Sequence, residues 1–143
     1  MIECTPKALA GGSDYIAIDT ETYYDSECSI KELGLHQYVR HPSFEVLLIS
    51  AATDTEVICE RPDRFPWDLL SGRKIIAHNA AFDRAVLRTI PEAPVTSVYD
   101  WMDTAGMCAY HQHPRSLKEA AAVVLDMSLT KDVRDRMKGK TLG

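Results

Sequence analysis

The feature that most constrains this chain is a short apolar segment followed at once by two carboxylates. Tyr15 to Ile18 have the character of a buried β-strand, and Asp19 and Glu21 follow two positions apart. Because side chains alternate along a strand, residues i and i+2 point to the same face. Two like charges held together are unfavourable unless a positive group lies between them. The stretch therefore predicts a strand-end carboxylate pair that binds a divalent metal, since Mg²⁺ takes oxygen ligands.

The rest of the chain predicts an α/β domain with a mixed sheet. A nearly continuous apolar run over 44–52 is typical of a central strand, and 55–59 is expected to pair back on it as a hairpin. A shorter buried strand is expected over 74–78, followed by a helix over 80–90 with Asn79 as its N-cap. Strands first and then alternating strand and helix is the order of a layered α/β domain.

Local signals predict several shorter elements. These are a helical turn over 30–34 ended by Gly34, a short helix over 67–70, a short strand over 98–101, a helix over 104–110 capped by Asp103, and a last helix opened by a capping box of Ser116 and Glu119. The expected division is a flexible lead-in over 1–14, one domain over 15–128, and a charged tail over 129–143, which is interpreted as a solvated helix or a disordered end.

Composition is that of a soluble globular protein. The chain has 143 residues, of which 45% are hydrophobic and 26% charged, and this is the size of one ordinary domain. The net charge of −5 gives no global attraction to nucleic acid, so a nucleic-acid role has to depend on a local site.

The spacing of the cysteines and the hydropathy of the chain indicate the cellular compartment in which the protein is expected. The four cysteines are widely spread without a C-x-x-C pair, which argues against zinc; they are Cys4, Cys28, Cys59 and Cys108. No signal peptide is visible, and no apolar run approaches the roughly 20 residues that span a membrane. We therefore expect a reducing, cytoplasmic setting in a bacterium or a phage-infected host, and no membrane partner.

A third carboxylate follows the second buried strand. Asp83 lies in the first turn of the helix expected over 80–90, where a carboxylate is favourably placed against the helix dipole. From there it is positioned to project towards the end of a neighbouring strand. Asp83 is thus expected to complete a cluster with Asp19 and Glu21.

These residues carry a resemblance to a known family. Asp19-x-Glu21 after an apolar strand, then Asn79-x-x-Phe82-Asp83, resembles the first two motifs of the DEDD 3′–5′ exonucleases. That family has a ribonuclease H-like fold and includes the proofreading domains of family A DNA polymerases and ribonucleases D and T. The segments 34–47, 103–107 and 116–118 resemble further parts of the phage-type polymerase domains.

The resemblance implies hydrolysis of the terminal phosphodiester of single-stranded DNA, or of RNA, with two Mg²⁺ or Mn²⁺ ions about 3.5–4 Å apart. It implies that Asp19 bridges both ions and that Glu21 and Asp83 each complete one site. Thr22 is a candidate contact to the terminal 3′ hydroxyl. Asn79 is expected to fix the substrate backbone or the Asp83 loop, and Phe82 to pack near a terminal base.

Each of these residues also has a purely structural interpretation. Asn79 is equally well explained as a helix cap and Thr22 as a loop residue, while Phe82 on the apolar side of its helix is better explained as core. His111 and His113, beside a proline, are better explained as a surface turn than as metal ligands.

The family's fourth acid has no counterpart in this chain. It normally stands in a Y-x-x-x-D or H-x-x-x-x-D pattern on a later helix, and no such pattern follows at the right distance. The chain is thus expected to be a C-terminally truncated ribonuclease H-like domain. Three hypotheses follow: an exonuclease beside a polymerase domain, an impaired module that binds nucleic acid or a protein, or an assembly in which a second chain supplies the missing helix.

Overall fold

The computed structural model describes residues 14–130, 136 and 138–142. These residues form a five-stranded sheet in the order β3-β2-β1-β4-β5. The strands are β1 (Tyr15–Thr22), β2 (Val46–Ala52), β3 (Val57–Glu60), β4 (Lys74–Ala77) and β5 (Trp101–Asp103). Strand β1 lies at the centre, antiparallel to β2 and parallel to β4. The pairs β2–β3 and β4–β5 are antiparallel and parallel, respectively. The expected mixed sheet of a ribonuclease H-like α/β fold is confirmed.

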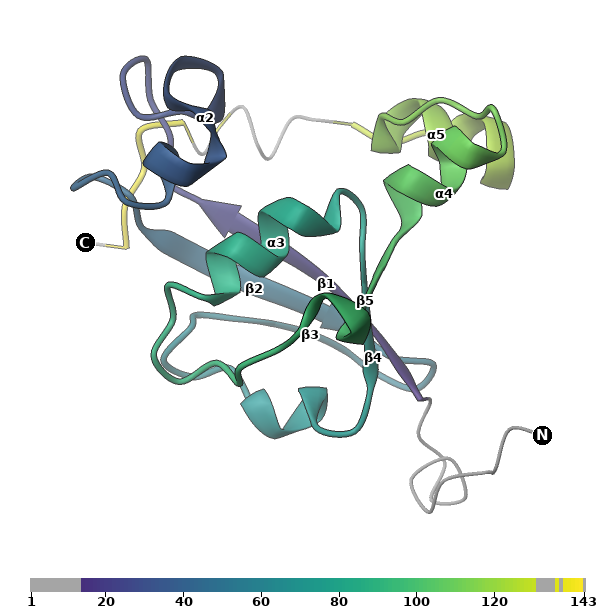
Figure 1. The fold of residues 1–143 in the computed structure, drawn as a ribbon, viewed down its shortest axis with the longest axis horizontal. Coiled ribbons are helices and arrows are strands. Elements are labelled where there is room, and N and C mark those ends of the chain that lie inside the picture. The colour runs from purple at the N-terminus through teal and green to yellow at the C-terminus, as the bar shows by residue number, and fades with distance from the viewer. Residues whose placement is uncertain (1–13, 131–135, 137, 143) are drawn as a thin grey trace.

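The helices lie over one face of this sheet and beyond its ends. They are α2 (Ile30–Tyr38), α3 (Ala80–Leu87), α4 (Thr104–Tyr110) and α5 (Leu117–Leu125), with short 3₁₀ helices η1 (Trp67–Leu70) and η2 (Val98–Asp100). Figure 1 shows α3 lying across the sheet, with α2 to one side of it and α4 and α5 standing apart on the other. None of the described helices is long and apolar enough to cross a membrane.

The hydrophobic core fills the space between the sheet and α3. Alternate residues of β1, such as Ile16 and Ile18, are buried there with Ile49 and Ile75 from its two neighbouring strands. Helix α3 contributes Val86, which is fully buried. Burying an aliphatic side chain of this size contributes about 1.5–3 kcal/mol. The core therefore fixes α3, and with it Asp83, against the central strand.

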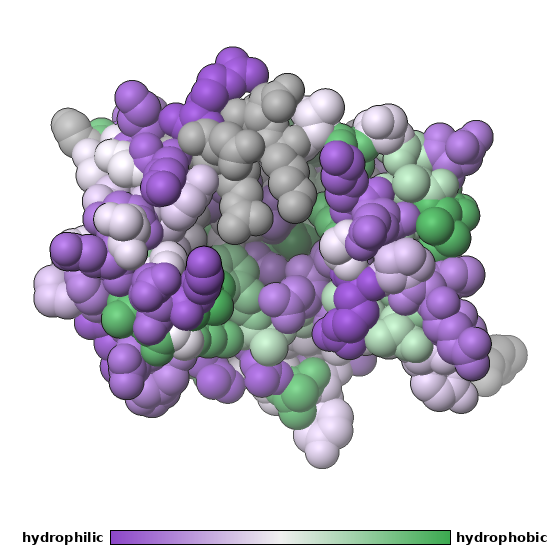
Figure 2. Space-filling view, turned by 90° about the horizontal axis from the view of Figure 1, so that it is seen from above, coloured by the Kyte–Doolittle hydropathy of each residue, from purple (hydrophilic) through white to green (hydrophobic). Residues whose placement is uncertain are grey.

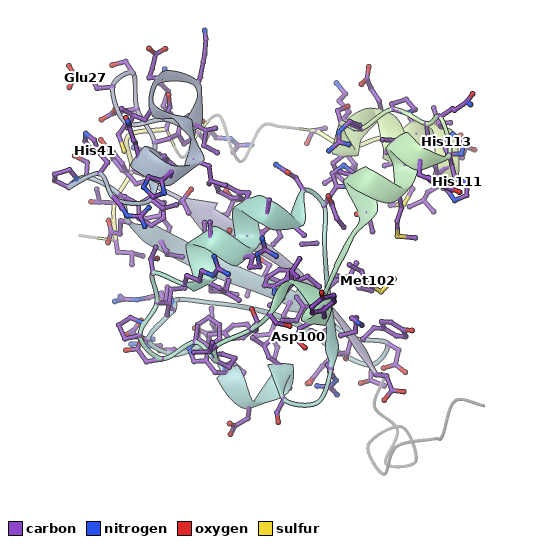
Figure 3. The ribbon with its side chains drawn as sticks, in the orientation of Figure 1. Glu27, His41, Asp100, Met102, His111 and His113 are labelled. Atoms are coloured by element: carbon purple, nitrogen blue, oxygen red, sulfur yellow. The ribbon has the colours of Figure 1, made fainter. Side chains whose placement is uncertain are left out.

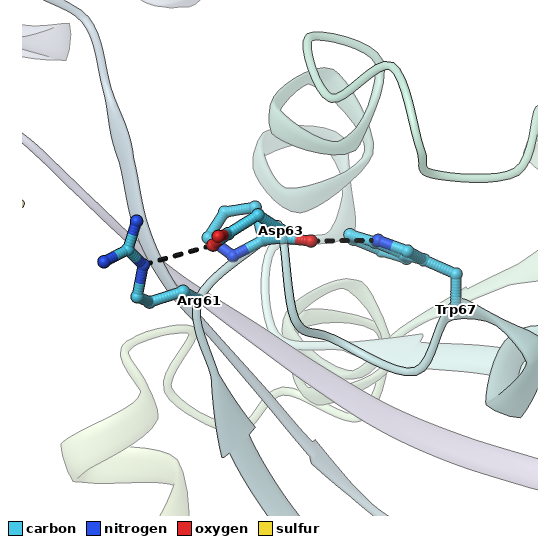
Figure 4. A network of polar contacts seen from close by, with 4 residues as sticks. Arg61, Asp63 and Trp67 are labelled. Carbon is cyan, nitrogen blue, oxygen red and sulfur yellow. Dashed lines mark hydrogen bonds and ion pairs between the residues drawn. The ribbon is translucent and has the colours of Figure 1, made fainter.

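The connection from β3 to β4 is held by local contacts (Figure 4). Arg61 Nε and Asp63 Oδ1 are 3.1 Å apart in an exposed ion pair. The indole Nε1 of Trp67 donates to the Pro62 carbonyl at 3.1 Å, and the Phe65 and Trp67 ring centroids are 4.7 Å apart. Phe65 is buried in the core, so this connection closes one end of it.

Two local predictions differ from the structure. The turn expected to stop at Gly34 continues as α2 to Tyr38, because Gly34 adopts φ 74° and ψ 160° and kinks the helix without ending it. The segment expected to form a strand over 98–101 is η2, and β5 starts only at Trp101. A capping box holds η2: the Ser97 side chain accepts from the Tyr99 amide, and Asp100 accepts from the Ser97 amide.

The end of one further element differs, and the start of another is as predicted. The helix expected over 80–90 ends at Leu87, and a turn follows in which Ile90 N donates to Leu87 O. Helix α5 begins at the predicted Ser116, whose hydroxyl accepts from the Glu119 amide and donates to the Glu119 carboxylate. The lead-in over 1–14 lies almost wholly outside the described residues, and so does much of the tail over 129–143.

Candidate active site

The two carboxylates of the first motif lie where β1 leaves the sheet. Asp19 is exposed, Thr20 is buried and Glu21 is half-buried, so the alternation of the strand continues through the motif. A bulge interrupts the pairing of β1 with β2 between Glu21 and Thr22. Asp19 and Glu21 therefore belong to the face of the sheet opposite the core, at the end of its central strand.

Asp83 reaches this strand end from α3. Its side chain is 2% exposed, and its Oδ1 accepts from the Thr20 amide at 3.1 Å and from the Thr20 hydroxyl at 2.7 Å. The geometry follows from the strand lengths. Pairing between β1 and β4 ends at Ala17 and Ile76, so the Thr20 amide has no partner on β4. The first turn of α3 follows the end of β4 and supplies the acceptor.

The two aspartates share an unfavourable electrostatic environment. Burial raises the pKa of Asp83 to about 7; the Thr20 hydroxyl opposes this rise, and the negative charge of Asp19 adds to it. Although the Asp19 side chain reaches solvent, partial desolvation by the surrounding protein also raises its pKa, and the Thr20 amide partly offsets the effect. Both carboxylates are therefore close to Thr20 and destabilise each other when ionised, and a cation bound there would stabilise the charged forms.

Glu21 does not form a three-ligand cluster with Asp19 and Asp83. Within 14–130, 136 and 138–142, no three histidine, cysteine, aspartate or glutamate side chains are grouped closely enough to hold a metal ion. The three predicted ligands thus lie on adjoining elements without forming a closed cluster. Their assignment as metal ligands stays a prediction.

Asn79 does not cap α3 with its side chain, contrary to the sequence prediction. It adopts the left-handed conformation, with φ 70° and ψ 59°, and makes no side-chain capping bond. Asparagine tolerates this conformation better than most residues. The amides of Asn79 and Ala80 are bound instead by Asp103 Oδ1, at 2.8 and 3.3 Å.

Asp103 thereby joins two helices. The same Oδ1 accepts from the Ala105 amide at 3.1 Å, so it caps α4 as predicted and also holds the start of α3. Burial raises the pKa of Asp103, but the hydrogen bonds from backbone amides to this carboxylate outweigh the effect of burial. The pKa of Asp103 is therefore below its ordinary value. The capping role was visible in the sequence; the contact with α3 depends on β5 lying beside β4.

His78 is a second residue that sequence reasoning missed. Its Nε2 is bound to the Arg115 carbonyl, which only accepts, so Nε2 carries the proton. Its other ring nitrogen, Nδ1, lies 2.9 Å from the Thr104 hydroxyl. His78 therefore ties the end of β4 to the start of α4 and to the segment before α5.

Thr22 and Phe82 both meet Tyr38, the last residue of α2. The Tyr38 hydroxyl donates to the Tyr23 carbonyl at 2.6 Å and is 2.7 Å from the Thr22 hydroxyl, which is left to act as the donor. The Phe82 ring stacks on Tyr38 at 6.4 Å and packs against the core. The structural interpretation of Phe82 is thus supported, and Tyr38 fixes the chain just after the acid pair.

The surface around these elements is hollowed. Figure 2 shows a depression between the part of the surface over α2 and the part over α4 and α5, with hydrophobic side chains visible inside it. Figure 3 places His111 and His113 at the outer end of the α4–α5 region, away from the elements that carry the acids. These histidines therefore contribute nothing to the site. The described cysteines, Cys28, Cys59 and Cys108, are all free.

Comparison with solved structures identifies proteins of the same fold. Brucella melitensis NrnC with bound Mg²⁺ is 21% identical over 82% of this chain and 56% of that chain, with a TM-score of 0.56. A second structure of Brucella melitensis NrnC is 20% identical over 88% of this chain and 59% of that chain, with a TM-score of 0.57. The apo form of a nuclease is 19% identical over 89% of this chain and 59% of that chain, with a TM-score of 0.56.

The similarity is one of fold. No model of a known family matches the chain, and no curated protein is significantly similar in sequence. The chain spans less than three-fifths of the length of the structures it matches. What the sheet order and these matches establish is a ribonuclease H-like α/β domain that resembles solved nuclease structures.

Proposed function

We propose that this chain is a metal-dependent nuclease domain that removes nucleotides from the 3′ end of single-stranded DNA. One observation carries the proposal: the buried Asp83 is held by Thr20, the residue between Asp19 and Glu21, at the end of the central strand, and the charge of Asp19 is near enough to raise the pKa of Asp83. Burying a carboxylate next to another one is costly, and function is the common reason for such an arrangement. The solved structures of the same fold, of which one holds Mg²⁺ and another is a nuclease, support the coarser part of the proposal, a metal-dependent nuclease.

The donor set fits a hard divalent cation. Asp19, Glu21 and Asp83 offer only carboxylate oxygens, the ligands that Mg²⁺ and Mn²⁺ prefer. When bound there, such ions activate a water molecule for attack on a phosphodiester and stabilise the leaving oxygen. Two ions are the number that the family resemblance implies. Asp19 would contribute to holding both ions, and Glu21 and Asp83 would contribute to one each.

The chain's other residues are assigned to support and to substrate contact. Thr20 orients Asp83 through its two hydrogen bonds, and Tyr38 holds the backbone that follows Glu21. Thr22, half-buried at the end of β1, is proposed to contact the terminal 3′ hydroxyl. Asn79 and Phe82 are proposed to border the terminal nucleotide, since both flank the first turn of α3.

The direction and the substrate are tested by end-labelled oligonucleotides. With Mn²⁺ or Mg²⁺ we expect single-stranded DNA labelled at its 5′ end to shorten in single-nucleotide steps, and a 3′ label to be released at once. Asp19→Ala is expected to abolish the reaction, while Asp126→Asn, an exposed acid after α5, leaves it unchanged. No trimming, or trimming that survives Asp19→Ala, contradicts the proposal. A parallel RNA oligonucleotide decides between the two nucleic acids.

The proofreading assignment predicts a further property. A proofreading domain acts on frayed primer ends, so a primer with a mismatched 3′ terminus is expected to be trimmed faster than a matched one. Equal rates on both primers contradict the assignment to a polymerase partner while leaving the nuclease proposal intact.

A second candidate is a catalytically impaired module that binds nucleic acid ends or a protein partner. It is favoured by the lack of a three-ligand metal cluster among the described residues. This candidate predicts binding of a fluorescent single-stranded oligonucleotide without cleavage at any Mn²⁺ concentration. Its binding would be unaffected by Asp83→Asn, whereas the enzyme would lose both metal-dependent binding and turnover.

A further inference from the structure

A basic segment near the end of the sequence has no role in the candidate active site. Arg136, Lys138 and Lys140 stand in a stretch, 136–142, that has no acidic side chain, although the net charge of the chain is −5. Residues 138–142 lie beside α2, on the side of the domain away from α4 and α5 (Figure 1). The cations of this segment are therefore brought back to the domain from the far side of α5.

Two contacts hold the segment in this place. The Gly139 amide donates to the Tyr24 carbonyl at 2.9 Å. Leu142 forms part of the wall of a pocket of about 570 Å³, which Phe44 and Ile90 also line. Gly139 has φ 71°, a conformation that glycine adopts at no steric cost. The chain therefore turns at Gly139 with a lysine on either side, and we call residues 138–140 the basic turn.

The basic turn is bound close to the acid pair. Tyr24 is three residues beyond Glu21, which is at most about 10 Å along an extended chain. The backbone between them is fixed, because the Tyr23 amide donates to the Glu45 carbonyl at 2.8 Å and the Tyr38 hydroxyl donates to the Tyr23 carbonyl at 2.6 Å. The basic turn therefore has a defined position at the border of the candidate active site.

The carboxylates near the basic turn do not neutralise it. Asp25 accepts from the Tyr23 hydroxyl and from two backbone amides of its own loop. Glu27 is exposed and, like Lys138 and Lys140, forms no ion pair within the part of the chain that the structure describes. Two exposed ammonium groups without a carboxylate partner are available to an anion, and phosphate groups are the anions that lysine commonly binds.

We propose that the basic turn binds the phosphates that precede the terminal nucleotide of a single-stranded nucleic acid. This rests on the proposed function, in which the terminal phosphodiester lies at Asp19 and Asp83 and the 3′ hydroxyl contacts Thr22. A strand that leaves the acids on the side of Thr22 next meets Tyr24 and the basic turn bound to it. A local basic surface at this point supplies the attraction that an acidic chain as a whole lacks.

The salt dependence of binding tests the phosphate contacts. The probe is a fluorescent single-stranded DNA of about ten nucleotides, with phosphorothioates at its 3′ end to resist cleavage, and its anisotropy is measured in Mg²⁺. For single strands the logarithm of affinity falls by about 0.7 per phosphate contact for each tenfold rise in salt. Lys138→Gln and Lys140→Gln should each lower this slope by about 0.7 and weaken binding about fivefold at roughly 0.1 M salt. Lys74→Gln, at the opposite end of the sheet, is the matched control and should change neither.

Gly139→Ala tests whether the position of the turn matters as well as its charge. The substitution removes no cation, but it forces an alanine to φ 71°, so binding should weaken about fivefold. Gly72→Ala is the matched control, because Gly72 has φ 68° in a turn at the other end of β4. An added Cβ meets nothing within 4 Å at either glycine, so the two variants differ only in where the backbone is strained. Gly72→Ala should bind as the wild type does.

A dinucleotide without a 5′ phosphate separates this inference from the proposed function. It contains only the scissile phosphate, so Lys138→Gln and Lys140→Gln should leave its cleavage unchanged while KM for the longer strand rises. If the wild type cleaves neither substrate but the salt slope falls as expected, the nuclease proposal fails and the binding role of the basic turn stands. An unchanged slope in both lysine variants, wild-type affinity in Gly139→Ala, or a wild type that does not bind the longer strand overturns the inference, whether or not the dinucleotide is cleaved.

Discussion

The Thr20 hydroxyl donates a 2.7 Å hydrogen bond to Asp83 Oδ1, and this contact joins the central strand to the first turn of α3. The two residues are 63 positions apart in sequence, and both are buried. Replacing Thr20 by valine keeps the shape and removes the hydroxyl. Because a hydrogen bond to a charged group contributes about 1.5–3 kcal/mol, we expect the free energy of unfolding to fall by that amount above pH 7. Thr20→Ser keeps the donor and should lose much less, as urea denaturation will measure.

The same substitution has an effect on the carboxylate itself. The Thr20 hydroxyl lowers the pKa of Asp83 against the effect of burial, so Thr20→Val should raise that pKa above its value of about 7. Nuclear magnetic resonance of the Asp83 carboxyl carbon as a function of pH measures the change. An unchanged titration curve would show that the hydroxyl does not bind the ionised form.

Asp83 predicts an unusual dependence of stability on pH. Its pKa is raised by burial from 3.8 to about 7, so the folded state binds this proton more tightly than the unfolded state does. The stabilisation is therefore complete below about pH 4 and is lost as the pH rises through 7. Each pKa unit corresponds to about 1.4 kcal/mol, which makes the effect a few kcal/mol.

Asp83→Asn isolates this contribution. The variant cannot ionise at this position, so its melting temperature should fall less than that of the wild type as the pH is raised from 4 to 8. Mg²⁺ or Mn²⁺ should raise the melting temperature of the wild type above pH 7 and leave that of Asp83→Asn nearly unchanged. Parallel melting curves of the two proteins across this range would refute the assignment.

Asp103 is expected to be a larger determinant of stability than its place outside the acid cluster suggests. One of its oxygens accepts from the amides of Asn79, Ala80 and Ala105. Losing a single helix cap costs about 0.5–2 kcal/mol, and Asp103→Ala removes the caps of α3 and α4 together. We therefore expect a loss of about 1–4 kcal/mol by chemical denaturation.

The pH dependence of Asp103 has the opposite sign to that of Asp83. Backbone amides hold its pKa below the ordinary value despite the opposing effect of burial, so its contribution is present above about pH 4 and is lost as the pH falls through its folded pKa. Asp103→Asn retains one side-chain acceptor and serves as the control. If Asp103→Ala has the stability of the wild type, water replaces the hydrogen bonds of this cap without cost.

A variant at Tyr38 tests the proposed contact between Thr22 and the substrate. Tyr38→Phe keeps the stacking on Phe82 and removes the hydroxyl that holds Tyr23 and Thr22. We expect a loss of about 1–3 kcal/mol in stability, because the two hydrogen bonds of this part-buried hydroxyl are removed. If Thr22 contacts the 3′ terminus, the Michaelis constant for an oligonucleotide should rise while the metal affinity stays the same.

Much of the fold could be predicted because it depends on local patterns. The apolar residues before Asp19 and the long run ending at Ala52 identify the two strands at the centre of the sheet, and both are present. Asp83 was expected in the first turn of a helix after a buried strand and lies there. Residue type and period are sufficient for such elements.

The remainder depends on contacts between distant segments. Asn79 was expected to cap α3, but Asp103 reaches the same amides from the neighbouring strand β5 and leaves Asn79 free to turn the chain. Tyr38 was hidden in a segment whose helical character depends on a kink at Gly34. The raised pKa of Asp83 likewise arises from burial, which no local pattern specifies.

The central claim is that Asp19 and Asp83 together bind a divalent cation. Calorimetric titration of Mn²⁺ into the protein well above pH 7, where Asp83 is ionised, tests it most directly. Binding is expected for the wild type and for Asp126→Asn, with affinity reduced by about tenfold or more in Asp19→Asn and Asp83→Asn, because each loses a charged ligand. Equal binding by the wild type and by a protein that carries both Asp19→Asn and Asp83→Asn would contradict the account. So would the absence of binding by the wild type.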